Sequence, residues 1–244
     1  MIVVEHLAKR FGAVQALHDV SFTARDGRIT GLLGANGAGK STTLRIISTT
    51  LKPNVGRAAV DGCDCARAPL AARRALGVLP NAAGLYPQLT ARENIRYFGE
   101  LHGLTRATID KRIAEWSERL DMDDILDRRT HGFSHGQKLK TALVRALVHA
   151  PRNVILDEPS SGLDVTATRA LREVIRDLKA HGCCVLFSSH IMQEVAALCD
   201  AIVIIAHGRM VANGTPQDIL ASTGAADLED AFVRASSGAD EATT

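Results

Sequence analysis

The sequence predicts an α/β fold with a mostly parallel sheet, because short, nearly continuous apolar segments alternate with helical patterns along the chain. Aromatic residues make up only 4% of the 244 residues, while Ala, Val, Leu and Ile are abundant, which suits a layered core. The expected strands span residues 2–4, 29–33, 76–79, 154–156, 185–188 and 201–205. A further apolar segment at 210–212 follows His207-Gly208 and predicts a terminal hairpin.

A change of period between about residues 89 and 150 predicts a helical subdomain inserted into this core. Ile109, Ile113, Trp116 and Leu120 recur at spacings of three and four, and Thr105 is a suitable N-cap. We therefore expect one domain over residues 1–220. The tail, 221–244, is expected to hold a short helix with Leu228 and Phe232, and about its last six residues should fray.

Composition excludes several classes of protein. The chain has 29 basic and 27 acidic residues, a net charge of +2 and no long basic block, so we expect no nucleic-acid partner. The N-terminus lacks the pattern of a secretory signal, and the apolar runs are too short to cross a bilayer. Any membrane role is expected to come through a partner. The five cysteines have no disulfide-framework spacing, and Cys63 and Cys65 lack a second pair to complete a metal site.

The segment after the expected strand at 29–33 has the pattern of a loop that holds a nucleoside triphosphate. Its glycines leave backbone N–H groups free to converge on phosphate oxygens, and a following helix adds the positive end of its dipole. Lys40 is expected to reach the outer phosphates and the Ser41 hydroxyl to bind Mg²⁺. The expected nucleotide-binding residues here are Gly34, Ala35, Asn36, Gly37, Ala38, Gly39, Lys40, Ser41 and Thr42.

Two carboxylates end the expected strand at 154–156. In a phosphate-loop protein the first, Asp157, helps to hold Mg²⁺, usually through water. The second, Glu158, can polarise a water for attack on the γ-phosphate, so it is our candidate general base. A strand that ends in Asp-Glu is more often only a solvated strand end, and the phosphate loop upstream changes that balance.

The order of the remaining motifs resembles that of the ATP-binding cassette (ABC) ATPases, from about residue 2 to residue 220. Phe133-Ser134-His135-Gly136-Gln137 resembles the family's signature segment, Ser161-Gly162-Leu163-Asp164 its D-loop, and Ser188-Ser189-His190 its switch histidine. Phe11 matches the position of the aromatic residue that stacks on adenine. The amino-acid sequence at 77–80, 89–94 and 190–195 is most similar to that of the ATPase subunits of sodium-extrusion and related exporters.

This resemblance implies a fold and a mechanism. The fold is a P-loop NTPase core with a mostly parallel sheet, an N-terminal antiparallel β subdomain and the helical insertion. Two copies meet head to tail, with ATP between the phosphate loop of one and Ser134, Gly136 and Gln137 of the other. Asp164 couples the two sites, and His190 contacts the γ-phosphate. Permease subunits in the membrane follow the motion, which places the chain at the inner face of the cell membrane.

Two positions depart from the family pattern. Asn81 stands where the family has a glutamine that binds Mg²⁺; it keeps the amide but is one methylene shorter, which weakens the case for direct metal contact. His135 replaces the first glycine of the signature, so a positive φ there would carry a cost. Both departures bear on the hydrolysis rate more than on nucleotide binding.

Other interpretations stay open at this point. Phe11 can be a core aromatic, and Asp164 and Ser134 can be simple helix caps. His190 can merely begin the next helix. The leading function is an ATP-hydrolysing exporter subunit, with Na⁺ or another small molecule as cargo. The alternatives are a soluble ABC ATPase of an assembly machine and an unrelated phosphate-loop enzyme, although the chain has no Asn-Lys-x-Asp segment to specify guanine.

Overall fold

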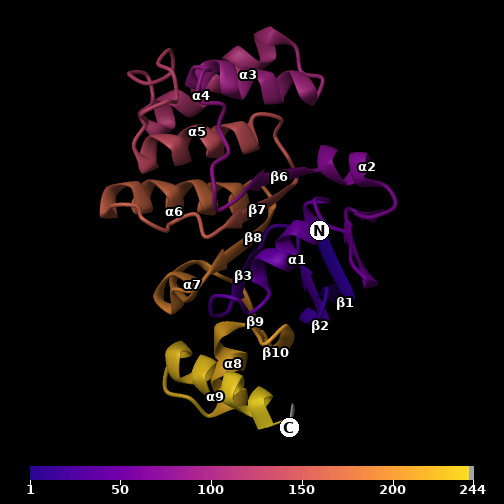
Figure 1. Cartoon of the computed structure of the whole chain (residues 1–244). Coiled ribbons are helices and arrows are strands. Elements are labelled where there is room, and N and C mark those ends of the chain that lie inside the picture. Colours follow the sequence, from indigo (N-terminus) through magenta and orange to yellow (C-terminus); the bar gives the residue numbers. More distant parts are fainter. Residues whose placement is uncertain (242–244) are drawn as a thin grey trace.

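The computed structural model describes residues 1–241, and in these a single mixed sheet carries helices on its faces (Figure 1). The strands are ordered β5-β4-β1-β2-β10-β9-β3-β8-β7-β6. Five neighbours in that order, from β9 to β6, run parallel. These strands are β9 (Ala201–Ala206), β3 (Ile29–Leu33), β8 (Cys184–Ser189), β7 (Asn153–Asp157) and β6 (Leu76–Leu79). The predicted α/β fold with a mostly parallel core is confirmed.

The parallel strands are buried on both faces. Every residue of β3 and β8 is buried, because helices cover the sheet on each side. One face packs on α1 (Lys40–Ile47), and α6 (Val165–Ala180) and α7 (Met192–Leu198) contribute buried residues to the core of the other. Parallel strands place their carboxyl ends at one edge of the sheet, where the phosphate loop and Asp157 therefore meet.

The N-terminal strands form an antiparallel layer that is longer than the sequence predicts. β1 (Ile2–Phe11) pairs antiparallel with β2 (Val14–Ala24) and with β4 (Val55–Val60), which pairs in turn with the short β5 (Cys63–Asp64). The prediction of a strand at 2–4 found only the apolar start of β1, because beyond it polar and apolar residues come in pairs and do not alternate. Helix α2 (Pro69–Arg74) then leads to β6.

Three helices form the inserted helical block, above the sheet in Figure 1. They are α3 (Ala91–Leu101), α4 (Arg106–Leu120) and α5 (His135–Leu147). Thr105 caps α4 as predicted, by accepting a bond from Thr108 N, and Ile109, Ile113 and Leu120 face the core.

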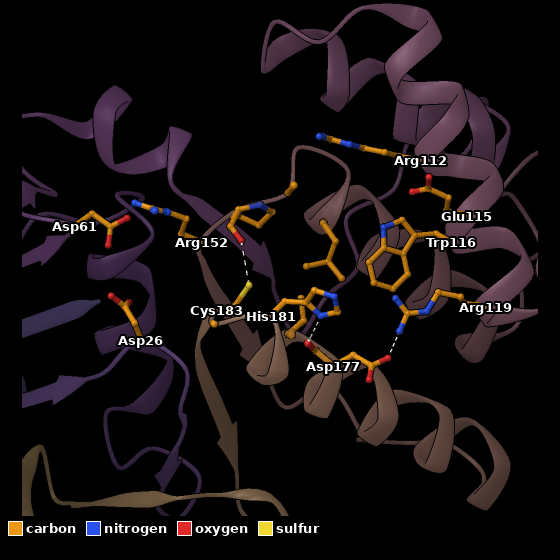
Figure 2. Close-up of a pocket in the computed structure, with 15 residues that line it drawn as sticks. Asp26, Asp61, Arg112, Glu115, Trp116, Arg119, Arg152, Asp177, His181 and Cys183 are labelled. Carbon is orange, nitrogen blue, oxygen red and sulfur yellow. Dashed lines mark hydrogen bonds and ion pairs between the residues drawn. The ribbon is translucent and has the colours of Figure 1, made fainter.

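A pocket of about 660 Å³ lies where this block meets the core (Figure 2). Trp116 and Arg119 of α4 line one wall, and Asp177 and His181, at the end of α6, line another. The Arg119 guanidinium pairs with Asp177 and lies 4.7 Å from the Trp116 ring centroid. The pocket also borders residues that precede β7 and β8, so it lies at the amino ends of the parallel strands, away from the phosphate loop.

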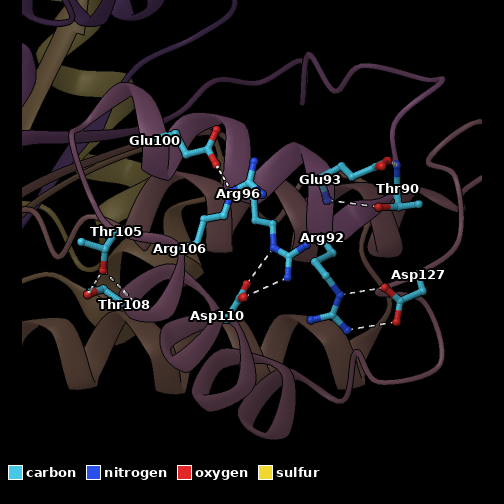
Figure 3. Close-up of polar contacts among 10 residues, drawn as sticks. All are labelled: Thr90, Arg92, Glu93, Arg96, Glu100, Thr105, Arg106, Thr108, Asp110 and Asp127. Carbon is cyan, nitrogen blue, oxygen red and sulfur yellow. Dashed lines mark hydrogen bonds and ion pairs between the residues drawn. The ribbon is translucent and has the colours of Figure 1, made fainter.

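Bidentate ion pairs hold the outer part of the helical block together (Figure 3). Arg96 of α3 bonds Asp110 of α4 at 2.7 and 2.9 Å, and Arg92 bonds Asp127 at 2.7 and 3.0 Å. These guanidinium groups hold the pKa of each carboxyl below its usual value. Thr90 and Glu93 form a capping box at the start of α3.

The chain ends in a hairpin and two helices. β10 (Arg209–Gly214) pairs antiparallel with β9, which confirms the predicted terminal hairpin. Helices α8 (Pro216–Thr223) and α9 (Leu228–Glu241) follow, and Leu228 is buried against the core. The expected fraying of the last six residues lies partly outside the described residues. Up to Glu241, no helix combines the length and apolar character needed to span a membrane.

Candidate nucleotide-binding site

The phosphate loop lies between β3 and α1, as its pattern requires. Gly39 adopts φ +113°, and a Cβ there would lie 2.6 Å from Leu17 Cδ2. A Cβ on Gly34 would lie 2.4 Å from the Ile205 carbonyl oxygen, which belongs to β9. Only glycine fits these two positions, so the neighbouring strands fix the path of the loop. The N-terminus of α1 directs its N–H groups toward the cavity that this loop lines.

Lys40 begins α1 and is buried, with only 4% of its side chain exposed. Its Nζ donates to the carbonyl oxygens of Gly34 at 2.6 Å and Ala35 at 3.1 Å. The same Nζ lies 3.4 Å from Oε1 of Glu158. The structure therefore brings the predicted phosphate-binding cation and the predicted base into direct contact.

Glu158 follows β7 in a left-handed conformation, with φ +49°. Its N–H lies 3.0 Å from Ser188 Oγ, and its Oε2 lies 3.3 Å from His190 Nδ1. Its carboxylate thus bridges Lys40 and His190, with 14% of the side chain exposed. A non-glycine residue in this conformation costs energy, and such strain is concentrated at functional sites.

Oxygen donors suitable for Mg²⁺ lie in and next to the same pocket. A cavity of about 400 Å³ is lined by loop residues with Ser41, Asn81 and Glu158. Asp157 precedes Glu158, and its Oδ1 accepts a hydrogen bond from Ser188 Oγ at 2.7 Å. Hydroxyl, carboxylate and amide oxygens are the ligands that Mg²⁺ prefers, so these side chains fit that ion.

The signature-like segment forms the start of α5. The Ser134 hydroxyl accepts a bond from Gln137 N at 3.2 Å, and Gln137 Oε1 accepts one from Ser134 N at 3.1 Å. This capping box fixes the helix N-terminus. His135 is the first residue of α5 and has helical backbone, so the cost expected for a positive φ does not arise. A Cβ on Gly136 would meet nothing within 4 Å.

Asp164 caps α6, since its Oδ1 accepts a bond from Ala167 N at 2.8 Å. The segment before it turns tightly, and Gly162 in that turn faces the His135 ring, which lies 3.6 Å from where a Cβ would stand. The D-loop-like and signature-like segments are therefore neighbours within one chain.

The structure does not bring every candidate residue to one place. Within the described part of the chain, the pocket beside the phosphate loop is lined by Ala35, Asn36, Gly37, Gly39, Lys40, Ser41 and Thr42, together with Ala16, Asn81 and Glu158. The predicted residues that do not line it are Phe11, Gly34, Ala38, Ser134, Gly136, Gln137, Asp157, Asp164 and His190. Phe11 is 47% exposed at the end of β1, so the alternative of a core aromatic is wrong.

Sequence reasoning missed two side chains that hold the site in shape. Ser188 ties Asp157 to Glu158 from the neighbouring strand. Arg145 of α5 is buried and donates to the carbonyl oxygens of Gly84 at 2.8 Å and Ala83 at 2.6 Å, just beyond Asn81. Burial lowers the pKa of its guanidinium. The signal for Ser188 was present as one of two serines before His190, whereas nothing in the sequence marks Arg145.

The fold and this site together define a nucleotide-binding protein of the phosphate-loop class. A family model described as ABC transporter matches residues 17–161. The chain therefore belongs to the ABC transporter family, as an ATP-binding subunit. It is 42% identical over 238 residues to the "ABC transporter ATP-binding protein NatA" of Bacillus subtilis (strain 168), a match that covers 96% of this chain and 97% of that protein.

Solved structures agree with this assignment. One described as "Structure of ATP binding subunit of ABC transporter" is 33% identical, with a TM-score of 0.91 over 96% of this chain and 99% of its own. The dimeric structure of MJ0796, a bacterial ABC transporter cassette, shares the fold with a TM-score of 0.81 at 23% identity. That match covers 88% of this chain and 98% of its own.

Proposed function

We propose that this chain hydrolyses ATP to drive export through a separate membrane permease. The observation that carries the proposal is the contact of Glu158 with both Lys40 and His190 beside the phosphate loop. The base and the phosphate-binding cation thereby line one pocket, and His190 contacts the base beside it. ATP binding and ATPase activity are general properties of the ABC family to which the chain belongs.

Each residue has a defined task in the proposed reaction. Lys40 exchanges its two carbonyl partners for the outer phosphates, which also releases Glu158 from the ion pair. Glu158 accepts a proton from the attacking water as the water oxygen bonds the γ-phosphorus and the bond to the ADP oxygen breaks. His190 orients the γ-phosphate and that water. Phe11 provides an exposed ring for the adenine.

Ser41, Asp157 and Asn81 would hold Mg²⁺ beside the phosphates. When bound, the ion supplies charge neutralisation on the phosphate oxygens. The Ser188 hydroxyl keeps Asp157 oriented, so the carboxylate needs little rearrangement to meet a cation. Asn81 reaches less far than a glutamine, so its contact with the ion is the weakest of the three.

A second copy of the chain completes the site. Ser134, Gly136 and Gln137 lie outside the pocket of their own chain, although the N-terminus of α5 is suited to an anion. A head-to-tail homodimer would place them over the partner's γ-phosphate, with Asp164 between the two sites. The dimeric form of a cassette with the same fold supports this arrangement.

The permease would dock on the helical block beside the segment after Asn81. Tyr86 and Tyr97 meet edge to face at 5.6 Å, and together with Leu101 they expose an apolar surface. Arg145 ties the preceding residues, Ala83 and Gly84, to α5. Motion at α5 is thereby linked to the docking surface, and the permease holds the chain at the inner face of the membrane. Export, with Na⁺ or another small molecule as cargo, follows the resemblance to exporter ATPases.

Two variants test the mechanism. Lys40→Ala should abolish high-affinity ATP binding in calorimetric titration. Glu158→Gln should bind ATP, stop turnover and accumulate a closed dimer by light scattering. Glu173→Gln is a control, because it alters an exposed glutamate of α6. Hydrolysis by Glu158→Gln at the native rate would show that Glu158 is not the base.

The partner needs its own experiment. Affinity purification from membranes should recover a multi-spanning protein bound to the chain. Recovery of a soluble scaffold instead would favour the alternative function, an ATPase of an assembly machine. The similar proteins compared above carry transporter names, which favour the exporter subunit.

A further inference from the structure

Glu194 of α7 is a buried carboxylate outside the machinery described above, with 7% of the residue exposed. Its Oε2 accepts hydrogen bonds from Ser160 Oγ at 2.5 Å and from Ser189 Oγ at 3.3 Å. Its Oε1 lies 3.9 Å from a terminal nitrogen of Arg172 on α6, which is too long for a hydrogen bond. Two hydroxyl groups therefore supply the close contacts of this charge.

The two hydroxyl groups come from the two segments whose positions matter most for hydrolysis. Ser160 lies in the turn between Glu158 and Asp164, where Ser161 N donates to Glu158 O at 3.2 Å. Ser189 ends β8 directly before His190, and its Oγ accepts a bond from Ile191 N at 3.0 Å. Glu194 thus accepts hydrogen bonds both from the D-loop-like turn and from the segment that carries His190.

We propose that Glu194 is a positioning residue that couples the D-loop-like turn to His190, an inference that rests on the proposed ATPase function. When a second chain presses on Asp164, the turn and Ser160 move together. Glu194 transmits the shift to Ser189 and hence to His190, which contacts the base Glu158. Hydrolysis is thereby tied to closure of the dimer, while ATP binding at the phosphate loop is not.

The energetics favour this role over plain packing. A buried charge without a hydrogen-bonded ion pair is costly, and an apolar side chain of similar size is often more stabilising in such a place. Arg172 adds to the cost, because its Nε is buried and has no hydrogen-bond partner among the described residues. A polar network held at such cost between two moving segments indicates a function in their coupling.

The test measures kcat, the KM for ATP and the ATP dissociation constant for full-length variants. Glu194→Ala removes the acceptor, and we expect kcat to fall by about 10- to 100-fold while ATP affinity changes less than about threefold. Glu194→Gln keeps an oxygen acceptor for both hydroxyl groups, so it should retain kcat within about threefold. Ser160→Ala should lower kcat by about tenfold, and the double variant Ser160→Ala/Glu194→Ala should be no worse than Glu194→Ala alone.

Each outcome decides the matter. Native kcat in a folded Glu194→Ala variant, or losses that multiply in the double variant, would overturn the coupling role. Equal losses of kcat and ATP affinity would indicate a structural role instead. If Glu194→Ala does not fold, native kcat in Ser160→Ala overturns the proposal, and a tenfold loss there with retention in Glu194→Gln supports it. Failure of the wild-type chain to hydrolyse ATP would refute the proposed function first, and this inference with it.

Discussion

Replacement of Gly136 by alanine separates the stability of one chain from the closure of two. Gly136 lies in the first turn of α5, and a Cβ there meets nothing within 4 Å of its own chain. Alanine is favoured over glycine in a helix by up to about 1 kcal/mol, so the isolated chain should be as stable as the native one or slightly more stable. The backbone N–H is retained.

The same methyl group should impair the dimer. If Gly136 faces the partner's γ-phosphate, the added carbon overpacks the dimer interface. This overpacking should reduce the free energy of dimerisation by about 1–3 kcal/mol at each of two symmetric sites. A total of about 2 kcal/mol or more weakens ATP-driven dimerisation at least about 30-fold. Gly136→Val should weaken it further, because the side chain is larger.

The assay uses the Glu158→Gln background, in which the closed dimer should accumulate. Light scattering against protein concentration gives the dimer affinity with ATP, and urea unfolding gives the stability of the chain. ATP affinity at concentrations where the chain is monomeric is the internal control and should not change. Unchanged dimer affinity in both Gly136 variants would refute the placement of this residue at the dimer interface.

Three further results are expected. Gly34→Ala places a Cβ 2.4 Å from the Ile205 carbonyl oxygen, so the loop must shift and calorimetry should show at least about tenfold weaker ATP binding. Burial lowers the pKa of His149 from its usual 6.5 to about 4, so the folded chain holds the neutral ring and the unfolded chain takes up the proton first. This contribution to the free energy of unfolding is complete above pH 6.5 and is lost as pH falls toward 4. In urea unfolding, the free energy of unfolding of the wild type should therefore fall by about 2 kcal/mol more than that of His149→Gln over that window. Burial raises the pKa of the thiols of Cys65, Cys184 and Cys199 to about 12, so these three should resist iodoacetamide at pH 8. The partly exposed Cys63 should be labelled, and Cys183 more slowly, as mass spectrometry can show. The protected thiols, labelled only after unfolding, are Cys65, Cys184 and Cys199.

The sequence predicts best what is local in the chain. The five parallel strands follow from continuous apolar runs, and the caps of α4 and α6 follow from Thr105 and Asp164. The full length of β1 and the whole of β2 were missed, because register shifts break their alternation with polar residues. The eight-residue α8 was missed as well, although Thr215 and Pro216 carry the usual start signal of a helix.

Contacts between segments were the harder part of the site. The motifs predict that Lys40, Glu158 and His190 serve one nucleotide, and the structure shows their side chains in contact. The bond of Ser188 to Asp157 depends on the register of β7 against β8, which no local pattern specifies. The contacts of Arg145 depend likewise on how the helical block folds over residues 83 and 84.

Buried charge points to the same parts of the molecule as the motifs do. Among the described residues, the charged side chains classed as buried are Lys40, Arg145 and Glu194. Carbonyl or hydroxyl groups supply the shortest contacts of all three. Desolvation of a charge costs several kcal/mol, and neutral partners return only part of it, so stability alone would favour apolar residues at these positions. Yet the three lie in the phosphate loop, behind the loop after Asn81, and between the D-loop-like turn and His190. In the proposed mechanism those are the segments that respond to ATP, to the permease and to the second chain, and a polar contact that can be exchanged suits a segment that has to move.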